Sequence, residues 1–332
     1  MTATIAEVAA RAGVSTATVS RVLSGSVAAR PDTRDRVLAA ARELDYRPSA
    51  IARALKRRET RTLGLLVTDV GNPFYPQVVA AVEAAAHELG YGIVLANGGN
   101  EVARELEHLD LLAERRVDGL IVASGHVTHE HLGRLERARL PVVLVNADVQ
   151  AAGIASVSTD HRLGARLATA HLVDLGHRRI GHISAPASHA AARARLAGVR
   201  DGTASVDDPV VVEGNADIAG GATAVAALLG AGVTAIVAYN DLTAIGALRA
   251  LHAAGRTVPD QVSVVGFDDI EMAAWTDPPL TTVRQPIPDL GRWAVERLVA
   301  GLRGSPAAAR AEHTVLAPSL VLRDSTRSVA RG

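Results

Sequence analysis

A regular alternation that begins at Thr62 constrains the fold most: short β-branched runs alternate with longer stretches rich in Ala and Leu. Parallel strands buried between helices produce this pattern. The alternation predicts strands at 63–67, 92–95, 119–122, 141–145, 180–183, 235–238 and 263–266, and helices near 76–89, 103–115, 163–175, 193–200, 221–229, 243–253 and 290–303. These strands and helices are more than one open sheet with its covering helices normally contains. We therefore expect an α/β body of two doubly wound parallel-sheet lobes.

The loops of this body do not resemble those of nucleotide enzymes. The chain contains neither G-x-G-x-x-G nor G-x-x-x-x-G-K-[ST], and it lacks the G-x-S-x-G nucleophile elbow. His126, His129 and His131 lie close together, but Glu130 is the only carboxylate that accompanies them, which is a poor donor set for a metal ion. We therefore expect no enzyme activity, no cofactor and no metal site.

Polar side chains follow most of the expected strands. Open α/β sheets bind ligands at the carboxyl ends of their strands, and carboxylates, amides and an arginine suit ligand hydroxyls or ring nitrogens. A single Asp or Asn at such a position can instead cap a turn or helix, the role that we expect for Asp241 and Asp269. The strand-end candidates are Asp69, Asn72, Phe74, Ser124, Asn146, Asp148, Asn240, Asp241, Asp268 and Asp269, with Arg193 and Arg195 beginning a later helix.

The first sixty residues follow a different, all-helical pattern. Residues 4–7 form a T-x-x-E capping box ahead of an apolar helical repeat that Gly13 ends. Ser15 can cap a second helix, and a third helix spans 32–44. This arrangement predicts a helix-turn-helix, whose second helix enters the DNA major groove; an unrelated three-helix bundle is the alternative. The exposed contact candidates on the second helix are Thr16, Ala17, Ser20 and Arg21.

The charge distribution supports a nucleic-acid role for this segment. Residues 1–60 hold eleven basic and six acidic groups, a net charge of +5, whereas the remainder holds 24 basic and 29 acidic groups. A basic head on an acidic body indicates that the head binds a polyanion. The chain has no cysteine and no apolar stretch of about 20 residues, and its N-terminus does not resemble a signal peptide. We therefore expect a cytoplasmic protein with no membrane partner.

Two runs near the N-terminus, TIAEVAARAGVSTATVSRVLSG and DYRPSAIARALKRRETRTLGLLV, closely resemble the lactose-repressor (LacI/GalR) family of bacterial transcription regulators. The resemblance continues through NPFYPQ, RRVDGLIV, LGHRRIGHI, YNDLTAIGAL, VSVVGFDD and PPLTTVRQP, and so covers nearly the whole chain. It implies a periplasmic-binding-protein-like body. The implied domains are a DNA-binding head at 1–47, a hinge helix and linker at 48–61, and an effector-binding and dimerisation domain at 62–332, with lobe 1 at about 62–158 and 287–315 and lobe 2 at about 159–286 and 316–332.

The resemblance also implies how the DNA is held. In the family the hinge helix folds on operator DNA beside its dimer mate, and a leucine matching Leu55 wedges into the minor groove. Arg30 departs from the family pattern, because a serine commonly caps the third helix there, and Ala6 stands where relatives often carry a polar or aromatic residue. The expected operator contacts are Thr4, Ser15, Thr16, Ala17, Thr18, Ser20, Arg21, Ser24, Tyr46, Ser49, Ala52, Arg53, Leu55 and Lys56.

For the effector, the resemblance selects residues among the strand ends. Asn146 stands where sugar-responsive relatives often have Asp, and Ala216 replaces a frequent stacking aromatic. A smaller or less ring-shaped effector, or stacking on Trp275, would fit these departures. The expected effector contacts are Asp69, Phe74, Ser124, Asn146, Arg195, Asn240, Asp268 and Trp275, with Ile287 near the rim of the cleft.

The sequence therefore predicts a sequence-specific transcriptional regulator, most simply a repressor, that binds a palindromic operator and responds to a carbohydrate or related metabolite. Because no leucine heptad follows Leu322, we expect a homodimer as the end state. Two alternatives are an α/β enzyme with an incidental helical head and an architectural DNA binder whose body only dimerises. The first should show a cofactor loop or an acid–base pair, and the second needs no polar strand ends.

Overall fold

The computed structural model describes residues 3–23, 30–46, 59–125, 127–147, 154–305 and 312–329, which form two units, Met1–Arg61 and Thr62–Gly332. The predicted hinge helix lies outside the described residues. Six expected operator contacts lie outside them as well: Ser24, Ser49, Ala52, Arg53, Leu55 and Lys56.

The head contains α1 (Ile5–Ala12), α2 (Thr16–Leu23) and α3 (Pro31–Glu43). The predicted capping box is confirmed, because the Thr4 backbone N–H donates to the Glu7 carboxylate over 2.7 Å and the Glu7 N–H donates to Thr4 Oγ1 over 3.3 Å. Gly13 ends α1 with a left-handed φ of +65°, which glycine adopts without a steric penalty. The capping box and the left-handed Gly13 therefore set where α1 begins and where it ends.

The helices of the head enclose a small apolar core. Ser15 caps α2 as predicted, since the Thr18 N–H donates to its Oγ over 3.2 Å. Val19 is fully buried, and Ala9 is buried in the same cluster as Val19 and Val37. Arg30 makes no side-chain capping bond to α3, as its departure from the family pattern suggests. The tight α1–α2 crossing therefore fixes the orientation of α2.

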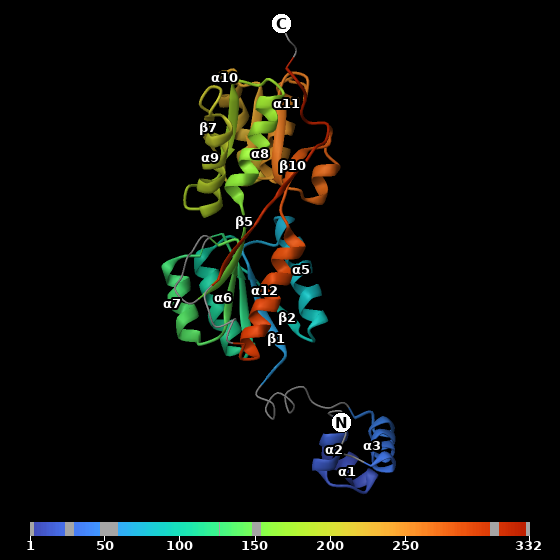
Figure 1. The fold of residues 1–332 in the computed structure, drawn as a ribbon. Helices are drawn as coiled ribbons and strands as arrows, with labels where there is room; N and C mark the ends of the chain where they lie inside the picture. The colour runs from blue at the N-terminus through green and yellow to red at the C-terminus, as the bar shows by residue number, and fades with distance from the viewer. Residues whose placement is uncertain are drawn as a thin grey trace. The chain divides into compact units, whose positions relative to one another are not determined.

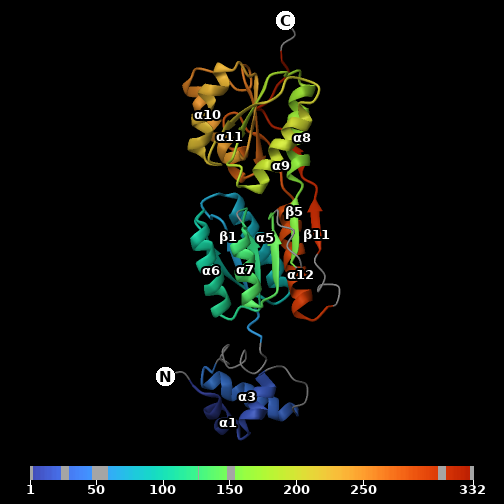
Figure 2. The same cartoon turned by 90° about the vertical axis from the view of Figure 1, so that its left-hand side faces the viewer.

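Two six-stranded sheets form the body, each flanked by helices (Figures 1 and 2). The strand order is β11-β5-β4-β3-β1-β2 in lobe 1 and β12-β10-β9-β8-β6-β7 in lobe 2. All neighbouring strands are parallel except β12, which runs antiparallel to β10. Both sheets therefore present most of their carboxyl strand ends at one edge, as doubly wound folds do.

Lobe 1 comprises β1 (Thr62–Val67), α5 (Phe74–Glu88), β2 (Gly92–Asn97), α6 (Val102–Glu114), β3 (Gly119–Ala123), α7 (His129–Ala138), β4 (Val142–Val145), β5 (Ala155–Thr159), α12 (Ile287–Leu302) and β11 (His313–Leu316). Lobe 2 comprises α8 (His161–Asp174), β6 (Ile180–Ser184), α9 (Ala190–Gly202), β7 (Val210–Glu213), α10 (Ile218–Gly230), β8 (Ala235–Ala238), α11 (Asp241–Ala253), β9 (Ser263–Asp268), the 3₁₀ turn η1 (Glu271–Ala274), β10 (Thr281–Arg284) and β12 (Ser319–Val321). The chain passes between the lobes after β5, after β10 and after β11.

Every predicted body strand and helix is present, with ends that differ by three residues at most. The sequence reading missed β5, β7, β10, β11, β12 and α7. The missed strands have three to five residues, and β7, β11 and β12 lie at sheet edges where their side chains are half-buried or exposed. β11 and β12 therefore lack the continuous apolar run that marks a central parallel strand, whereas β7 contains three consecutive valines that the sequence reading did not assign to a strand.

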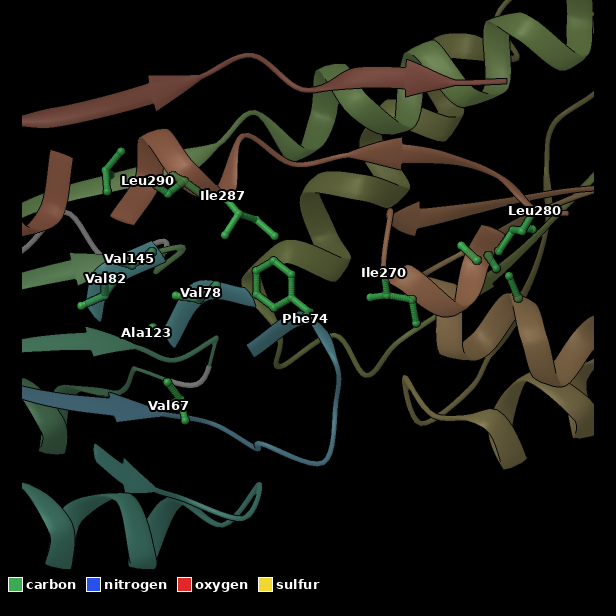
Figure 3. Close-up of a cluster of buried hydrophobic side chains, with 14 of the residues drawn as sticks. Val67, Phe74, Val78, Val82, Ala123, Val145, Ile270, Leu280, Ile287 and Leu290 are labelled. Atoms are coloured by element: carbon green, nitrogen blue, oxygen red, sulfur yellow. The ribbon is translucent and has the colours of Figure 1, made fainter. Parts of the chain in front are cut away.

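The apolar core continues from one lobe into the other. Phe74 and Ile287 are 7% and 5% exposed and belong to the same cluster as Ile270 and Leu280 of lobe 2. In Figure 3, Phe74 and Ile287 lie beyond the ends of the strands that carry Val67, Ala123 and Val145, on the side of Ile270 and Leu280. Apolar contact thus joins the two lobes beside their polar strand ends.

Two glycines bring α10 and α11 into backbone contact. A Cβ atom at Gly246 would lie 1.9 Å from the Ile218 carbonyl oxygen, and one at Gly221 would lie 2.0 Å from the Thr243 carbonyl oxygen. We expect Gly246→Ala to lower the free energy of unfolding by at least about 1–3 kcal/mol, because the helices must separate to admit the methyl group. Urea unfolding measures this loss.

Gly230→Ala is the matched control on α10. Nothing lies within 4 Å of the added Cβ, and alanine favours a helix over glycine by about 1 kcal/mol. Stability equal to that of wild type or slightly higher is therefore expected. Equal losses for Gly246→Ala and Gly230→Ala would contradict the close-contact explanation.

Candidate functional site

Two adjoining cavities lie at the carboxyl strand ends of the body. The inner cavity has a volume of about 60 Å³, and its lining includes Asn146, Arg195 and Asp268. The outer cavity has a volume of about 580 Å³, and its lining includes Asp69 and Ala216. The two share five lining residues: Asn72, Tyr75, Gly125, Tyr239 and Asn240. They therefore form one continuous candidate ligand site.

Arg195, from the second turn of α9, is the cation of the inner cavity. Its side chain is 5% exposed, and its guanidinium carbon lies 3.6 Å from the Phe267 ring centroid and 4.5 Å from that of Tyr239. Nη1 donates to the Tyr239 carbonyl oxygen, and Nη2 donates to Asp268 Oδ1 over 3.4 Å. Contact with the two rings fixes the position of the planar guanidinium and shields it from water.

Asp268, the last residue of β9, faces this guanidinium. Burial raises the pKa of Asp268 to about 6, although Arg195 and a hydrogen bond from Gln285 favour its ionised form. Its φ of +118° lies in a region that non-glycine residues rarely adopt. A strained, desolvated carboxylate is typical of functional sites, where the surrounding structure holds it in place.

Gln285 connects this carboxylate to lobe 1. Its Nε2 donates to Asp268 Oδ1 over 2.7 Å, and its Oε1 accepts from Asn146 Nδ2 over 3.0 Å and from Thr159 Oγ1 over 2.7 Å. The Thr159 N–H in turn donates to Asn146 Oδ1 over 2.8 Å. A continuous hydrogen-bonded path therefore runs from the ligand-facing charges to the strand ends β4 and β5.

Two buried donors of the inner cavity have no hydrogen-bond partner among the described residues, Arg195 Nε and His161 Nε2. Burial lowers the pKa of His161 well below its ordinary value, and Arg195 lowers it further, so the ring is neutral at pH 7. Since Arg195 Nη2 lies 3.4 Å from His161 Nδ1 and can only donate, Nε2 carries the ring proton. Both nitrogens are therefore buried donors on residues that line the inner cavity.

The structure brings together five of the residues expected to contact effector. Phe74, Asn146, Arg195, Asn240 and Asp268 all line the inner cavity, and Asn240 borders the outer cavity too. Asp69 lines only the outer cavity, where its carboxylate also accepts from the Gly71 N–H over 2.9 Å.

Ser124 was placed wrongly by the sequence reading. It lines neither cavity, and it is fully buried with its hydroxyl donating to Glu105 Oε2 over 2.8 Å. Because side chains alternate across a strand, Ala123 reaches the inner cavity and Ser124 turns to the opposite face. His131 donates to the same carboxylate over 3.0 Å, since its Nδ1 accepts from the Thr128 N–H.

The segment around His131 also differs from expectation. Residues 129–138 form α7, which was not among the expected helices, and the acidic partner of His131 is Glu105, which is distant in sequence. In the described part of the chain, no group of three His, Cys, Asp or Glu residues is arranged to hold a metal ion.

Trp275 does not lie where the stacking hypothesis needs it. Its side chain is 81% exposed and lines neither cavity, so it is removed from the candidate site. Ile287 is buried in the apolar core instead of at a cavity rim. Ala216, in contrast, lines the outer cavity, so the small residue at this position leaves space.

The expected capping roles of Asp241 and Asp269 are wrong. Asn240 caps α11, because its Oδ1 accepts from the Thr243 N–H over 2.8 Å. Asp241 is buried and accepts from the Ile270 N–H, and burial raises its pKa well above the ordinary value. Asp269 forms ion pairs of 2.6 Å with Arg284 and Arg323.

The sequence reading missed several residues of the inner cavity, namely Tyr75, His161, Tyr239 and Gln285. Gln285 follows β10, which was not recognised as a strand, so the strand-end rule was never applied to it. Tyr239 follows β8 and could have been found by that rule, since it directly precedes Asn240.

On the head, α2 presents its N-terminal polar residues to solvent. Ser15, Thr16, Ala17 and Arg21 are exposed, as is Thr4, while Thr18 and Ser20 are half-buried. Tyr46 is half-buried against the head core. The exposed set forms a candidate nucleic-acid surface.

Among the described helices, none is both long and apolar enough to cross a membrane.

Comparison with known proteins identifies two family matches. Residues 4–49 match the model of "Bacterial regulatory proteins, lacI family", and residues 60–317 match that of "Periplasmic binding proteins and sugar binding domain of LacI family". Among curated proteins, the ribose operon repressor of Haemophilus influenzae is 35% identical over 334 residues, which cover 98% of this chain and 99% of that one.

Solved structures agree with these matches. The lac repressor dimer bound to operator and the anti-inducer ONPF has a TM-score of 0.89 at 31% identity, covering 99% of this chain and 100% of that one. A complex of the transcriptional regulator CelR with cellobiose has a TM-score of 0.74 at 34% identity, covering 97% and 99% of the two chains.

The raised pKa of Asp268 predicts a pH-dependent stability. The folded state keeps the proton up to about pH 6, whereas an unfolded chain releases it near pH 4. Between these values the folded state binds more protons, so stability falls as pH rises. Asp268→Asn cannot ionise, and we expect it to match wild type near pH 4 and to exceed it by about 2–3 kcal/mol at pH 7.

Urea unfolding at several pH values measures this difference. A difference between Asp268→Asn and wild type that stays constant from about pH 4 to pH 7 would show that Asp268 is not the titrating group.

Proposed function

Because the chain belongs to the LacI family of bacterial regulatory proteins, we propose that it is a transcriptional repressor that binds a palindromic operator as a homodimer. Its effector is a sugar or related metabolite bound between the lobes. The observation that carries the proposal is a helix-turn-helix head joined in one chain to a body with a desolvated Arg195–Asp268 pair in a cavity. Such a regulator acts on the chromosome, so we place it in the cytoplasm.

The head would bind DNA through α2. A helix fits the major groove, where base edges are distinguishable, and Thr16, Ala17, Ser20 and Arg21 lie on α2. Ser15 and the first backbone N–H groups of α2 are suited to phosphate. A homodimer supplies two such heads, which matches the two halves of a palindromic site.

The body would sense the effector. Arg195 Nε and His161 Nε2 are buried donors without partners in the described chain, and a ligand with oxygen acceptors would satisfy both. Because Asp268 also holds Gln285, which bonds to Asn146 in lobe 1, a ligand on Asp268 acts on the connection between the lobes. It shifts the lobe orientation only by its differential affinity for the two states. The proposed activity is binding, with no catalytic step.

Arg21→Ala tests the recognition helix. We expect operator affinity to fall by about 5- to 150-fold, which corresponds to 1–3 kcal/mol for a lost base contact. Fluorescence anisotropy measures this on a palindromic duplex selected with the wild-type protein from a random pool. A phosphate contact would instead reduce the slope of log affinity against log salt by about one.

Arg11→Ala is the control, because Arg11 lies on α1 and pairs with Glu43 of α3. An exposed pair of this kind contributes about 0–1 kcal/mol, so operator affinity should change little. Wild-type affinity in Arg21→Ala would remove α2 from the proposed interface.

Leu55→Ala tests the hinge. An apolar wedge stabilises a kinked duplex, and the shorter alanine loses that contribution. Operator affinity should therefore fall, by at most several kcal/mol, while the effect of a bound sugar on the melting temperature of the protein stays unchanged. Equal operator affinities in a gel-shift titration at one salt concentration would exclude the wedge.

A further inference from the structure

We propose that the effector is a neutral oligosaccharide of two or more sugar units, one end of which enters the inner cavity while the remainder occupies the outer cavity. This inference rests on the proposed effector-controlled function and specifies the ligand class of the same site. It reverses the expectation of a small effector that the alanine at position 216 suggested.

The sizes of the cavities support an extended ligand. The inner cavity, at about 60 Å³, has the volume of about two water molecules at roughly 30 Å³ each. The outer cavity, at about 580 Å³, falls within the range of about 300–1,000 Å³ that is typical of small-molecule sites. A ligand restricted to the inner cavity would leave most of the available space filled with water.

The cavities adjoin, so one ligand can reach both. Tyr75, Tyr239 and Asn240 line both. Asn240 Nδ2 donates to the Ala216 carbonyl oxygen over 2.9 Å, which holds the Ala216 segment beside this boundary. Because Ala216 carries only a methyl group, its side chain does not close the passage toward the outer cavity.

The charges of the outer cavity favour a neutral, hydroxyl-rich ligand. Its described lining contains two carboxylates, Asp69 and Asp217, and neither Lys nor Arg. Each carboxylate uses Oδ1 within the protein: Asp69 accepts from the Gly71 N–H over 2.9 Å, and Asp217 accepts from the Gly220 N–H over 2.6 Å. The second oxygens can accept hydroxyl protons, whereas a phosphate or carboxylate of a ligand would be repelled.

An apolar surface completes the outer cavity. Ile218, at the start of α10, and Met272, in η1, are 40% and 42% exposed, and both line this cavity. Exposed apolar side chains next to polar groups are typical of ligand-binding grooves. The C–H face of a sugar ring can pack on Ile218 and Met272 while its hydroxyls reach the carboxylates.

The test begins with thermal unfolding of the full chain in the presence of a defined panel. The probes are D-glucose, D-galactose and D-ribose, the oligosaccharides maltose, cellobiose, lactose and maltotriose, and glucose 6-phosphate as the anionic probe. Ligands that bind the native state raise the melting temperature. We expect at least one oligosaccharide to raise it at concentrations at which its component monosaccharides and glucose 6-phosphate do not.

Ala219→Trp then tests the outer cavity directly. Ala219 is an exposed residue of α10 that lines this cavity, so the indole fills the space without entering the core. We expect its affinity for the active oligosaccharide to fall at least tenfold in calorimetric titration. Ala227→Trp is the control, because Ala227 is also exposed on α10 but lines neither cavity, and it should bind as wild type does.

Three outcomes would overturn the inference: a response only to monosaccharides or to glucose 6-phosphate, no response to any probe, or wild-type oligosaccharide affinity in Ala219→Trp. Operator binding by the same wild-type preparation separates this failure from failure of the proposed function. Intact operator binding with a silent panel rejects only the oligosaccharide, whereas loss of operator binding rejects the regulator.

Discussion

The organisation of the body depends on a charge pair that is buried without being fully satisfied. Arg195 lies over two aromatic rings and its Nε has no hydrogen-bond partner among the described residues, while Asp268 is strained in its backbone and hard to ionise. Buried pairs of this kind add little net stability, because the desolvation of both charges offsets their attraction. A ligand-binding role, in which hydrogen bonds to a ligand stabilise this pair, explains its presence better than a contribution to stability does.

The same pair explains why the site lies where the chain passes between the lobes. Gln285 bonds to Asp268 at one end and to Asn146 and Thr159 at the other, and it lies between β10 and α12. An amide at this position responds to both lobes, because any change in their orientation lengthens one set of its bonds. The neighbouring apolar contacts of Phe74 and Ile287 are non-directional and tolerate such a change.

Much of the fold could be predicted from the sequence, because buried parallel strands and amphipathic helices leave strong periodic signals. Short edge strands such as β11 and β12 could not be, since half-exposed side chains carry no such signal. The candidate site was likewise predicted only in part. Arg195 and Asp268 were found by the strand-end rule and then selected by the family resemblance, but Gln285 was missed together with the unrecognised β10. Ser124 was misplaced because adjacent residues of a strand face opposite ways, and a list of strand ends does not distinguish the two faces.

The order of the elements along the chain has a consequence for biosynthesis. Lobe 1 is not complete when β5 leaves the ribosome, because α12, which packs on α5 and the lobe 1 sheet, begins at Ile287. From Thr159 to Ile287 the ribosome adds 128 residues, which takes roughly 6 to 25 s at 5–20 residues per second. During that interval most of lobe 2 is synthesised, while the apolar surface that α12 will cover stays open. The nascent chain is therefore most exposed to aggregation just before its last helix is translated, and chaperone binding would be concentrated at that stage.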